Sequence, residues 1–486
     1  MTLKIKSGAS VDAILLTIVK FFTIVIGLLT VRIISIHFSY SDYGTYNQAI
    51  LIASSVSSIT ILGFTDAANY YFNKFSSQRD AQLEYISNII IFQIILGILA
   101  FIILFWGHRL LSNLMDNNEL SGVIKWIAFT PLLSNIIAIQ QILFISIGKS
   151  RIIAVRNVLI SLLKLLAVLI SVYLTNSIVT ILALILLFDI FQALYFAISL
   201  HKYGIIISLR VFSFKTLRCI LSYSIPITIF LITNVLMRDT DKYIVSILSN
   251  PETFAIYSNA SRILPFSIIV DSFTTVLIPF ITRYLHNQKY ENLIDTYRNY
   301  LNLSFVIIWI LVTGALLCSS DLIELLYGNK YSIGLPIFIV YMVVSLVKFA
   351  NFSLIFSCAG ETKIILKISA ISLSINIILS LILFYFWGPI GCAIATLIIS
   401  VFTVFCYFIK TKEILKVSPL GLIEVRDMFY LILQSLFWAC LVFVLQKMFD
   451  DISYLVRLMI TYGIYVIALL FINRSKLKRY ILALNN

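Results

Sequence analysis

Charged residues are scarce in this chain of 486 residues, because Asp, Glu, Lys and Arg together make up only 12% of it. A soluble globular domain carries about 25% charged residues. Apolar residues make up 60% of the chain, and they gather into runs of roughly 20 residues, the length that a helix needs to cross a bilayer. These runs lack the strict alternation of an outer-membrane barrel. The composition therefore excludes a soluble protein and predicts an all-α polytopic membrane protein.

Histidine is also rare, with four residues, and none of them lies in the middle of an apolar run. The chain has no H-E-x-x-H zinc motif, no G-x-S-x-G nucleophile motif and no P-loop for nucleotide phosphates. The segments between the apolar runs are too short to hold a soluble catalytic domain. We therefore expect no catalytic residues and a protein that is not an enzyme.

The six cysteines have neither the spacing of a metal site nor that of a disulfide framework. They lie scattered in apolar runs at Cys219, Cys318, Cys358, Cys392, Cys406 and Cys440. We interpret them as small packing residues. No bound metal is expected, and no cofactor other than a coupled H⁺ or Na⁺.

Fourteen membrane-spanning helices are expected from the apolar runs. Their approximate ranges are 12–36, 43–65, 85–106, 122–147, 152–175, 178–200, 219–247, 254–284, 299–320, 333–358, 363–387, 389–410, 427–446 and 453–473. Lys4 and Lys6 precede the first run, which lacks a small-residue cleavage site, so we expect a spanning helix there and not a cleaved signal peptide. Two polar stretches, about 66–84 and 285–298, are expected to lie as amphipathic segments on the cytoplasmic surface.

The Lys and Arg residues of the loops predict the orientation of the chain. If the N-terminus is cytoplasmic, the opposite side holds only Arg109, Lys125, Lys330 and Lys447, and the other loop Lys and Arg residues are all cytoplasmic. The positive-inside rule therefore places both termini in the cytoplasm of a multi-pass membrane protein. The same bias explains most of the net charge of +14, so we expect no nucleic-acid partner.

Two sequence motifs recur in the same order and at nearly the same offset. Gly-Lys-Ser-Arg-Ile-Ile at 148–153 returns as Gly-Glu-Thr-Lys-Ile-Ile at 360–365, an offset of 360 − 148 = 212 residues. Arg32 and the following Asp-Tyr-Gly-Thr-Tyr-Asn at 42–47 match Lys242 and the segment at 252–259. Duplicated sets of apolar helices are a common architecture of transporters, with the substrate path between the two sets.

The repeat predicts the domain organisation. Spans one to six form an N-lobe over 1–212, spans seven to twelve form a C-lobe over 213–415, and residues 416–486 hold two extra helices with a basic cytoplasmic tail. Since each lobe has an even number of spans, both lobes insert the same way up. We therefore expect a parallel repeat, related by a rotation about the membrane normal.

Several charged residues lie within or at the edges of the predicted spans, where a charge at the bilayer centre costs at least about 2.5–3.5 kcal/mol. Lys20, Lys164 and Lys348 lie near mid-span, so they are expected to line a wet cavity or to form structural ion pairs. Arg32, Arg156 and Arg457 lie closer to the ends of their spans, where snorkelling to the interface explains them as well.

A charged cluster lies in the outer half of span seven, at Arg238, Asp239, Asp241 and Lys242, and Arg262 lies at a similar depth in span eight. One interpretation is a charge-paired knot between the two helices. The other is that the basic residues flank a central cavity from both lobes, since Arg32 and Lys242 occupy matching positions of the repeat. A cavity with more cations than anions suits an anionic substrate such as a phosphate or pyrophosphate.

The candidate substrate-binding residues of this cationic cavity all carry a positive charge. They are Lys20, Arg32, Lys164, Lys242, Arg262 and Lys348. Asp189 and Asp271 are the mid-span acids outside the cluster of span seven. Either one is a candidate for a proton or cation site, or a counter-ion for a nearby lysine.

Several segments resemble the polysaccharide-transporter (O-antigen flippase) family. Leu-Ser-Tyr-Ser-Ile-Pro at 221–226, Asp-Lys-Tyr-Ile-Val at 241–245 and Ala-Ile-Tyr-Ser-Asn-Ala-Ser-Arg at 255–262 resemble the middle of these proteins. Ser-Asp-Tyr-Gly-Thr-Tyr at 41–46 resembles their first loop. The layout of the whole chain is similar too, in its length, span count, termini and duplicated lobes.

The resemblance implies a V-shaped fold of two six-helix lobes, like that of multidrug and lipid-intermediate exporters, plus the two C-terminal helices. It implies a flippase that moves an undecaprenyl-pyrophosphate-linked oligosaccharide, an O-antigen or capsule-like repeat unit, from the cytoplasmic to the periplasmic leaflet of the bacterial inner membrane by alternating access. Membrane lipids, a polysaccharide polymerase and a chain-length regulator are the partners it suggests.

Two other functions remain open on the same fold. A flippase for a lipid-linked peptidoglycan precursor would share the fourteen spans. A cation-coupled multidrug antiporter would have a more acidic or aromatic cavity and usually twelve spans. The sequence does not choose among the sugars that a flippase would carry.

Overall fold

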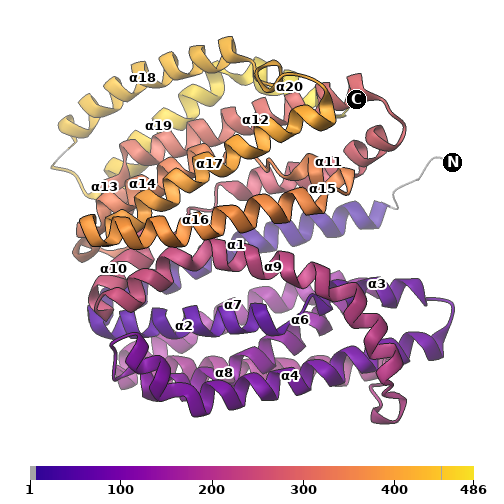
Figure 1. The fold of residues 1–486 in the computed structure, drawn as a ribbon. Coiled ribbons are helices and arrows are strands. Elements are labelled where there is room, and N and C mark those ends of the chain that lie inside the picture. Colours follow the sequence, from indigo (N-terminus) through magenta and orange to yellow (C-terminus); the bar gives the residue numbers. More distant parts are fainter. Residues whose placement is uncertain (1–6, 450, 486) are drawn as a thin grey trace. The chain divides into compact units, whose positions relative to one another are not determined.

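The computed structural model describes residues 7–449 and 451–485, so Lys4 and Lys6 lie outside the described range. Within that range every regular element is a helix, and 14 helices or helix pairs are long and apolar enough to cross a membrane. The prediction of an all-α polytopic membrane protein with about 14 spans is therefore confirmed (Figure 1).

Two compact units divide the chain: Met1–Asp239 with Ser246–Ala255, and Thr240–Val245 with Ile256–Asn486. Each is described by itself. The helix α9, Phe214–Leu248, contributes residues to both units. The lobe boundaries that the sequence repeat predicts, after residues 212 and 415, stay a prediction.

The first unit contains the helices of the N-terminal half. They are α1 (Ser7–His37), α2 (Tyr40–Thr60), α3 (Phe64–Lys74), α4 (Arg79–Leu114), α5 (Leu120–Ile127), α6 (Thr130–Ser146), α7 (Ser150–Ile170) with a π-helical end η1 (Ser171–Thr175), α8 (Ile178–Lys202) and the 3₁₀ turn η2 (Leu209–Val211). In this unit α1 packs along α7, and α6 contacts α2, α3, α4 and α8.

Aromatic side chains form much of the core of the first unit, where Phe64, Phe144 and Phe196 are fully buried. The same core holds the N-terminal part of α9. Tyr71 donates a hydrogen bond from its hydroxyl to the carbonyl of Cys219 at 3.1 Å, and its neighbour Tyr70 stacks on an α9 tyrosine with ring centroids 4.6 Å apart. This part of α9 is therefore packed with the N-terminal helices.

The second unit contains the remaining helices. They are α10 (Pro251–Ala260, shared with the first unit), α11 (Ser267–His286), α12 (Tyr290–Leu317), α13 (Ser319–Tyr327), the 3₁₀ helix η3 (Asn329–Gly334), α14 (Leu335–Val347), α15 (Leu354–Ala359), α16 (Thr362–Trp387), α17 (Pro389–Leu415), the 3₁₀ turn η4 (Pro419–Leu422), α18 (Val425–Met448), α19 (Tyr454–Ile472) and α20 (Arg474–Asn485). The helices α16 and α17 lie side by side, and α12 contacts α11, α14, α18, α19 and α20 (Figure 1).

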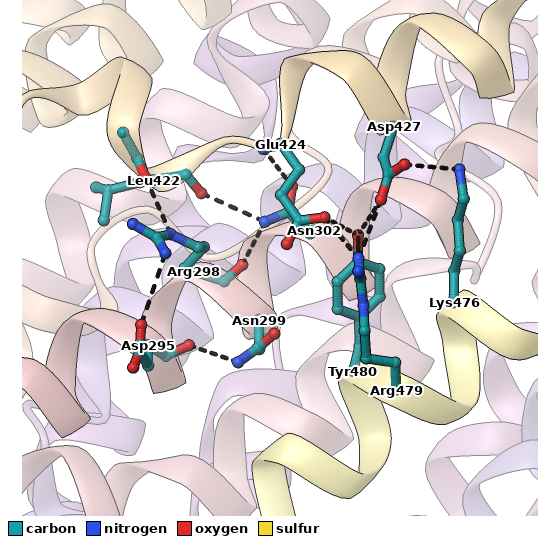
Figure 2. A network of polar contacts seen from close by, with 11 residues as sticks. Asp295, Arg298, Asn299, Asn302, Leu422, Glu424, Asp427, Lys476, Arg479 and Tyr480 are labelled. Carbon is teal, nitrogen blue, oxygen red and sulfur yellow. Dashed lines mark hydrogen bonds and ion pairs between the residues drawn. The ribbon is translucent and has the colours of Figure 1, made fainter.

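A polar network fastens the C-terminal helix α20 within the second unit (Figure 2). Arg479 lies 2.6 Å from Glu424 and 3.0 Å from Asp427, and Lys476 lies 3.0 Å from Asp427. Tyr480, which is fully buried, donates a hydrogen bond to Glu424 at 2.9 Å. Burial raises the pKa of Tyr480, so the hydroxyl keeps the proton that it donates. The basic tail is therefore a docked helix.

Four predicted spans are not single helices, which corrects the expected continuous ranges. The breaks lie at 61–63 between α2 and α3, at 128–129 between α5 and α6, at 261–266 between α10 and α11, and at 348–353 between α14 and α15. Pro131 stands at the start of α6 and Pro265 lies inside the third break. Proline lacks the N–H that a continuous helix needs, so it favours a break there, while the composition stays apolar throughout.

The two polar stretches that were expected on the cytoplasmic surface are mostly helical. Most of 66–84 belongs to α3, a separate short helix after the break at 61–63, and to α4, and residues 75–78 connect them. Residues 290–298 form the first turns of α12. The position of both stretches on the membrane surface stays a prediction.

The recurring glycine motif marks the same kind of helix end in both copies. Gly148 has φ of +73° and Gly360 has φ of +76°, the left-handed conformation that glycine adopts without steric cost. The amide after each glycine bonds the carbonyl five residues earlier, at 2.9 Å in both copies. This pattern is the Schellman motif. The repeat in the sequence therefore corresponds to matching ends of α6 and α15.

The second recurring motif marks matching helix starts. The hydroxyl oxygen of Ser39 accepts a hydrogen bond from the amide of Asp42 at 3.0 Å, at the start of α2. The side-chain oxygen of Asn250 accepts one from the amide of Thr253 at 2.9 Å, at the start of α10. Both are N-caps, which satisfy amides left free in the first helical turn. A superposition of spans one to six on spans seven to twelve stays a prediction.

Candidate functional site

A polar cavity of about 420 Å³ lies inside the first unit. Four helices supply its wall: α1, α6, α7 and α8. The polar residues that line it are Thr23, Ser134, Gln141, Arg156, Asn157, Ser161, Lys164, Asp189 and Gln192. Because these helices are otherwise strongly apolar, so many polar side chains at one place need a structural or functional reason.

One polar stripe of α7 provides most of the wall. Asn157, Ser161 and Lys164 are spaced by four and three residues, so they lie on the same face of the helix. Asp189 and Gln192 have the same three-residue spacing on α8. The cavity is therefore built from the helical period, with polar residues at the positions where α7 and α8 face each other and α6.

The cavity carries two cations and one carboxylate. Lys164 and Arg156 are the charged groups that act on Asp189, with Lys164 the stronger of the two. All three side chains are half-buried. The structure therefore brings together two residues that the sequence singled out separately, Lys164 and Asp189, and it leaves the cavity with an excess of positive charge.

Snorkelling to the interface was one explanation for Arg156, and the structure gives this side chain partners at the cavity. Its guanidinium donates hydrogen bonds to Gln141 at 3.2 Å and to Asn157 at 2.5 Å, and it lies 5.2 Å from the centre of the Phe196 ring. Polar partners on α6 and α7 hold the side chain at the cavity. Within the described cavity wall, the buried Nε of Arg156 and the buried Oε1 of Gln192 have no hydrogen-bond partner.

Gln141, Asn157 and Gln192 were not predicted as cavity residues, and Arg156 was predicted only as a cation near the end of its span. A signal for the three amides was present, because uncharged polar residues recur at helical spacing beside Lys164 and Asp189. The prediction of the cavity rested on charged residues, and amides and hydroxyls at the same depth were left out.

The other candidate residues of the first unit lie on α1. Lys20 is exposed and stands one turn before Thr23, which lines the cavity, so both share one face of the helix. Arg32 lies farther along α1 and is half-buried. Neither residue belongs to the wall of the described cavity.

The second unit holds the remaining candidates. Lys242 on α9 and Arg262 after α10 are half-buried, and Lys348 lies exposed at the end of α14. Asp271 lies on an exposed face of α11. The expectation that the six basic residues share one cavity stays a prediction, and so does ion coupling by Asp189 or Asp271.

Two tyrosines bind the carboxylate of Asp241, which is fully buried in the second unit. Tyr257 of α10 donates a hydrogen bond at 2.6 Å, and Tyr341 of α14 donates another to the same oxygen. Lys348, at the end of α14, also acts electrostatically on this carboxylate. Asp239 instead pairs with its neighbour Arg238 at 2.7 Å. The charged cluster of span seven is thus divided, with one acid held by an arginine and one by tyrosines.

Snorkelling was also one explanation for Arg457, and the structure gives this side chain an ion-pair partner. Its guanidinium makes a bidentate ion pair with Asp321 of α13, with nitrogen–oxygen distances of 3.0 and 2.6 Å. The paired carboxylate lies on a separate short helix more than a hundred residues earlier. A pair of this geometry is structural, since both groups satisfy each other.

Comparisons with known proteins agree with this architecture. A family model described as "Polysaccharide biosynthesis protein" matches residues 31–336. No curated protein sequence matches the chain. Similar solved structures include the lipid II flippase MurJ in an inward closed conformation, at 18% identity and a TM-score of 0.74, covering 95% of this chain and 99% of that one.

Two further structures belong to the MOP superfamily. An inward-facing multidrug resistance MATE family transporter is 15% identical with a TM-score of 0.62, covering 80% of this chain and 98% of that one. A MOP superfamily transporter from Pyrococcus furiosus is 15% identical with a TM-score of 0.60, covering 84% and 94%. These similarities establish a MurJ/MATE-like fold, as expected from the sequence.

Proposed function

We propose that this chain, which belongs to the polysaccharide biosynthesis protein family, is a flippase for a lipid-linked oligosaccharide. The substrate is an undecaprenyl-pyrophosphate-linked repeat unit, of O-antigen or capsule type. The protein moves it from the cytoplasmic to the periplasmic leaflet of the bacterial inner membrane by alternating access. Both termini lie in the cytoplasm, in accord with the Lys and Arg bias of the loops.

The observation that carries the proposal is the cation-rich cavity within a family whose members act on polysaccharides. Arg156 and Lys164 outnumber Asp189 in a chamber walled by four membrane helices. A diphosphate carries the opposite charge, and arginine binds phosphate oxygens through two parallel hydrogen bonds. We propose that Lys20, Arg32, Lys242, Arg262 and Lys348 bind the same headgroup in the course of transport.

The architecture supports the proposal of a transporter over that of an enzyme. Spanning helices and short connections account for nearly all of the described residues. A polymer-synthesising enzyme needs acid/base groups in a site that admits water and soluble substrates. Transport of a lipid-linked intermediate needs only binding groups and two accessible states.

A peptidoglycan-precursor flippase is the second candidate. The MurJ structure covers 95% of this chain, whereas the multidrug MATE transporter and the MOP superfamily transporter from Pyrococcus furiosus cover 80% and 84%. This difference supports a lipid-linked substrate over a drug. A multidrug antiporter fits the positive cavity poorly, because cationic drugs would be repelled.

Complementation tests the proposal and separates the candidates. The chain is expressed in strains that lack either a repeat-unit flippase or the peptidoglycan-precursor flippase, each with a panel of surface polysaccharides. We expect surface polysaccharide to return for at least one repeat unit. Rescue of the peptidoglycan strain alone would support the second candidate, and failure with every repeat unit, at normal protein levels, would contradict the first.

A lysine variant links this activity to the cavity. Lys164→Ala removes one charge-assisted phosphate contact and should lower surface polysaccharide about tenfold, while the amount of protein in the membrane stays unchanged. Lys412→Ala, at an exposed position near the end of α17, is the matched control and should behave like the unchanged protein. An unchanged amount of surface polysaccharide in the Lys164→Ala variant would show that this cavity does not bind the substrate.

A further inference from the structure

We propose that the groove between α7 and α8 receives the polyprenyl tail of the substrate next to its diphosphate, and that Arg151 and Arg156 hold that diphosphate. The inference rests on the proposed function, because it names the surface that receives the lipid part of that substrate. The observations behind it concern the walls of the groove, the position of its arginines and its connection to the polar cavity.

The groove has a volume of about 650 Å³ and belongs entirely to the first unit. Its walls are apolar side chains of both helices, including Val155, Leu159 and Leu163 of α7 and Phe188 and Phe191 of α8. Side chains at the edge of the groove are exposed, with 61% of the surface of Val155 and 62% of that of Phe191 accessible. An apolar hollow of this kind, on helices that are long and apolar enough to cross a membrane, suits a hydrocarbon chain.

The two arginines give the groove a polar end. Arg151 lies in the first turn of α7, and Arg156 lies five residues deeper, a rise of about 7.5 Å along the axis. The apolar wall continues to Leu163, a further seven residues or about 10 Å. Ile152 and Val155 lie between the two arginines, and the apolar wall continues beyond Arg156. Both cations therefore lie toward one end of the groove, as a diphosphate lies at one end of its polyprenyl tail.

The groove and the polar cavity share a wall. Arg156, Ile160 and Gln192 line both of them. Among the described residues of that wall, Arg156 Nε and Gln192 Oε1 are buried without a hydrogen-bond partner. A single molecule can thus place its tail on one side of this wall, its phosphates on Arg156 and its polar group toward the cavity on the other side.

Charge and shape favour a polyprenyl diphosphate over a bulk phospholipid. A phospholipid has two acyl chains on one phosphate, whereas this groove offers one slot and two arginines. A bulk lipid also has no sugar that would use the hydroxyl and amide groups of the cavity, such as Ser161 and Asn157. Arginine inside a membrane span is costly unless an anion or polar cavity receives it.

Photolabelling of the full chain tests the assignment without a variant. The purified protein is placed in phosphatidylcholine nanodiscs with a polyprenyl diphosphate that carries a diazirine in its first isoprene units. We expect labelled peptides within 151–163 and 188–195, with labelling removed by excess unlabelled polyprenyl diphosphate but not by phosphatidylglycerol. Equal competition by phosphatidylglycerol would assign the groove to bulk anionic lipid and overturn the inference.

A matched pair of tryptophan variants tests the slot itself. Leu159→Trp fills the groove and should reduce labelling about tenfold. Leu162→Trp is the control, because Leu162 lies on the same helix but outside the groove, and 47% of its surface is exposed against 54% for Leu159. This variant should change labelling less than about twofold. Arg156→Gln should weaken the apparent affinity for the probe about tenfold, because it removes the charge but keeps an amide.

The outcomes separate this inference from the proposed function. If the unchanged protein flips the oligosaccharide lipid in proteoliposomes but Leu159→Trp labels and flips normally, the tail lies elsewhere and the proposed function stands. If the unchanged protein does not flip it, yet labelling follows the groove residues, the groove binds such lipids and the proposed function fails. Elution of each variant as a single species in gel filtration shows that lost labelling is not lost folding.

Discussion

Asp189 is the acidic side chain that lines the cavity together with two cations, and this position makes it the stronger candidate for coupling transport to an ion gradient. Asp189→Asn keeps the size and hydrogen-bonding capacity of the side chain but can neither release a proton nor attract a cation. We expect substrate binding to change less than about twofold, while stimulation of transport by a proton or sodium gradient in proteoliposomes is lost.

The paired variant Asp271→Asn provides the comparison, because Asp271 lies on an exposed face of α11 outside this cavity. We expect it to keep gradient stimulation. Loss of stimulation only in the Asp271 variant would move the coupling site to the second unit. If both variants transport at the unchanged rate and still respond to the gradient, neither acid couples, and passive flipping pulled by downstream polymerisation becomes the better mechanism.

Asp241 shows what the sequence could not predict at the scale of single residues. The charge of this residue and its place in the outer half of span seven were visible, and a charge-paired knot was one interpretation. Two of its hydrogen-bond donors in the structure are Tyr257 and Tyr341, and the second of these lies 100 residues away on another helix. A buried carboxylate also accepts hydrogen bonds from uncharged donors, and charge patterns alone do not identify those donors.

The repeated sequence motifs correspond to matching helix ends in the structure. Gly148 and Gly360 have left-handed φ values, and a Cβ added at either position would meet no atom within 4 Å. Substitution by alanine therefore adds no clash with other residues, only the backbone strain of a left-handed L-residue, about 1–2 kcal/mol. We expect Gly148→Ala and Gly360→Ala each to lower the unfolding free energy by about 1 kcal/mol, measured by denaturant unfolding in detergent micelles.

Gly107→Ala is the matched control for these variants. Gly107 lies inside α4, and an added Cβ there also meets nothing within 4 Å, but its φ is helical. Alanine is the better helix former by about 1 kcal/mol, so this variant should be as stable as the unchanged protein or more stable. Destabilisation of all three variants by the same amount would show that the left-handed turns are not the cause.

The spans illustrate which elements apolar composition can predict. Fourteen runs of sufficient length predicted fourteen spans, because crossing the bilayer requires a minimum length of apolar helix. The four breaks within spans were missed, since a broken helix inside a protein keeps the same apolar composition. Pro265 was a local signal for one of them, and the break before α15 had no comparable signal in its residues.

At the scale of the whole molecule, the fold class was predictable and the site was predictable only in part, while the duplication of the two lobes stays a prediction. A fixed offset between two motifs is visible in one sequence, and its meaning as matching caps follows from general rules of helix ends. The cavity was not predicted as a place, because it requires knowing which faces of α6, α7 and α8 meet. Lys164 and Asp189 were identified as residues but not as neighbours.

The unpartnered atoms of the cavity wall have a consequence for how the whole protein responds to its ligand. Arg156 Nε and Gln192 Oε1 are buried within the described wall without a hydrogen-bond partner in the protein, so a bound molecule can bond both of them. Any molecule that satisfies them adds to stability by mass action, about 2.7 kcal/mol at a concentration one hundred times its dissociation constant.

Thermal unfolding is therefore a direct search tool for the physiological ligand, independent of any transport assay. Polyprenyl diphosphates with different sugars should raise the unfolding temperature in the order of their affinity, and neutral lipids should leave it unchanged. In Gln192→Leu the empty protein should unfold at a higher temperature than the unchanged protein while its response to ligand shrinks. A variant that gains stability but loses its response to ligand would indicate that the polar cavity serves binding and not folding.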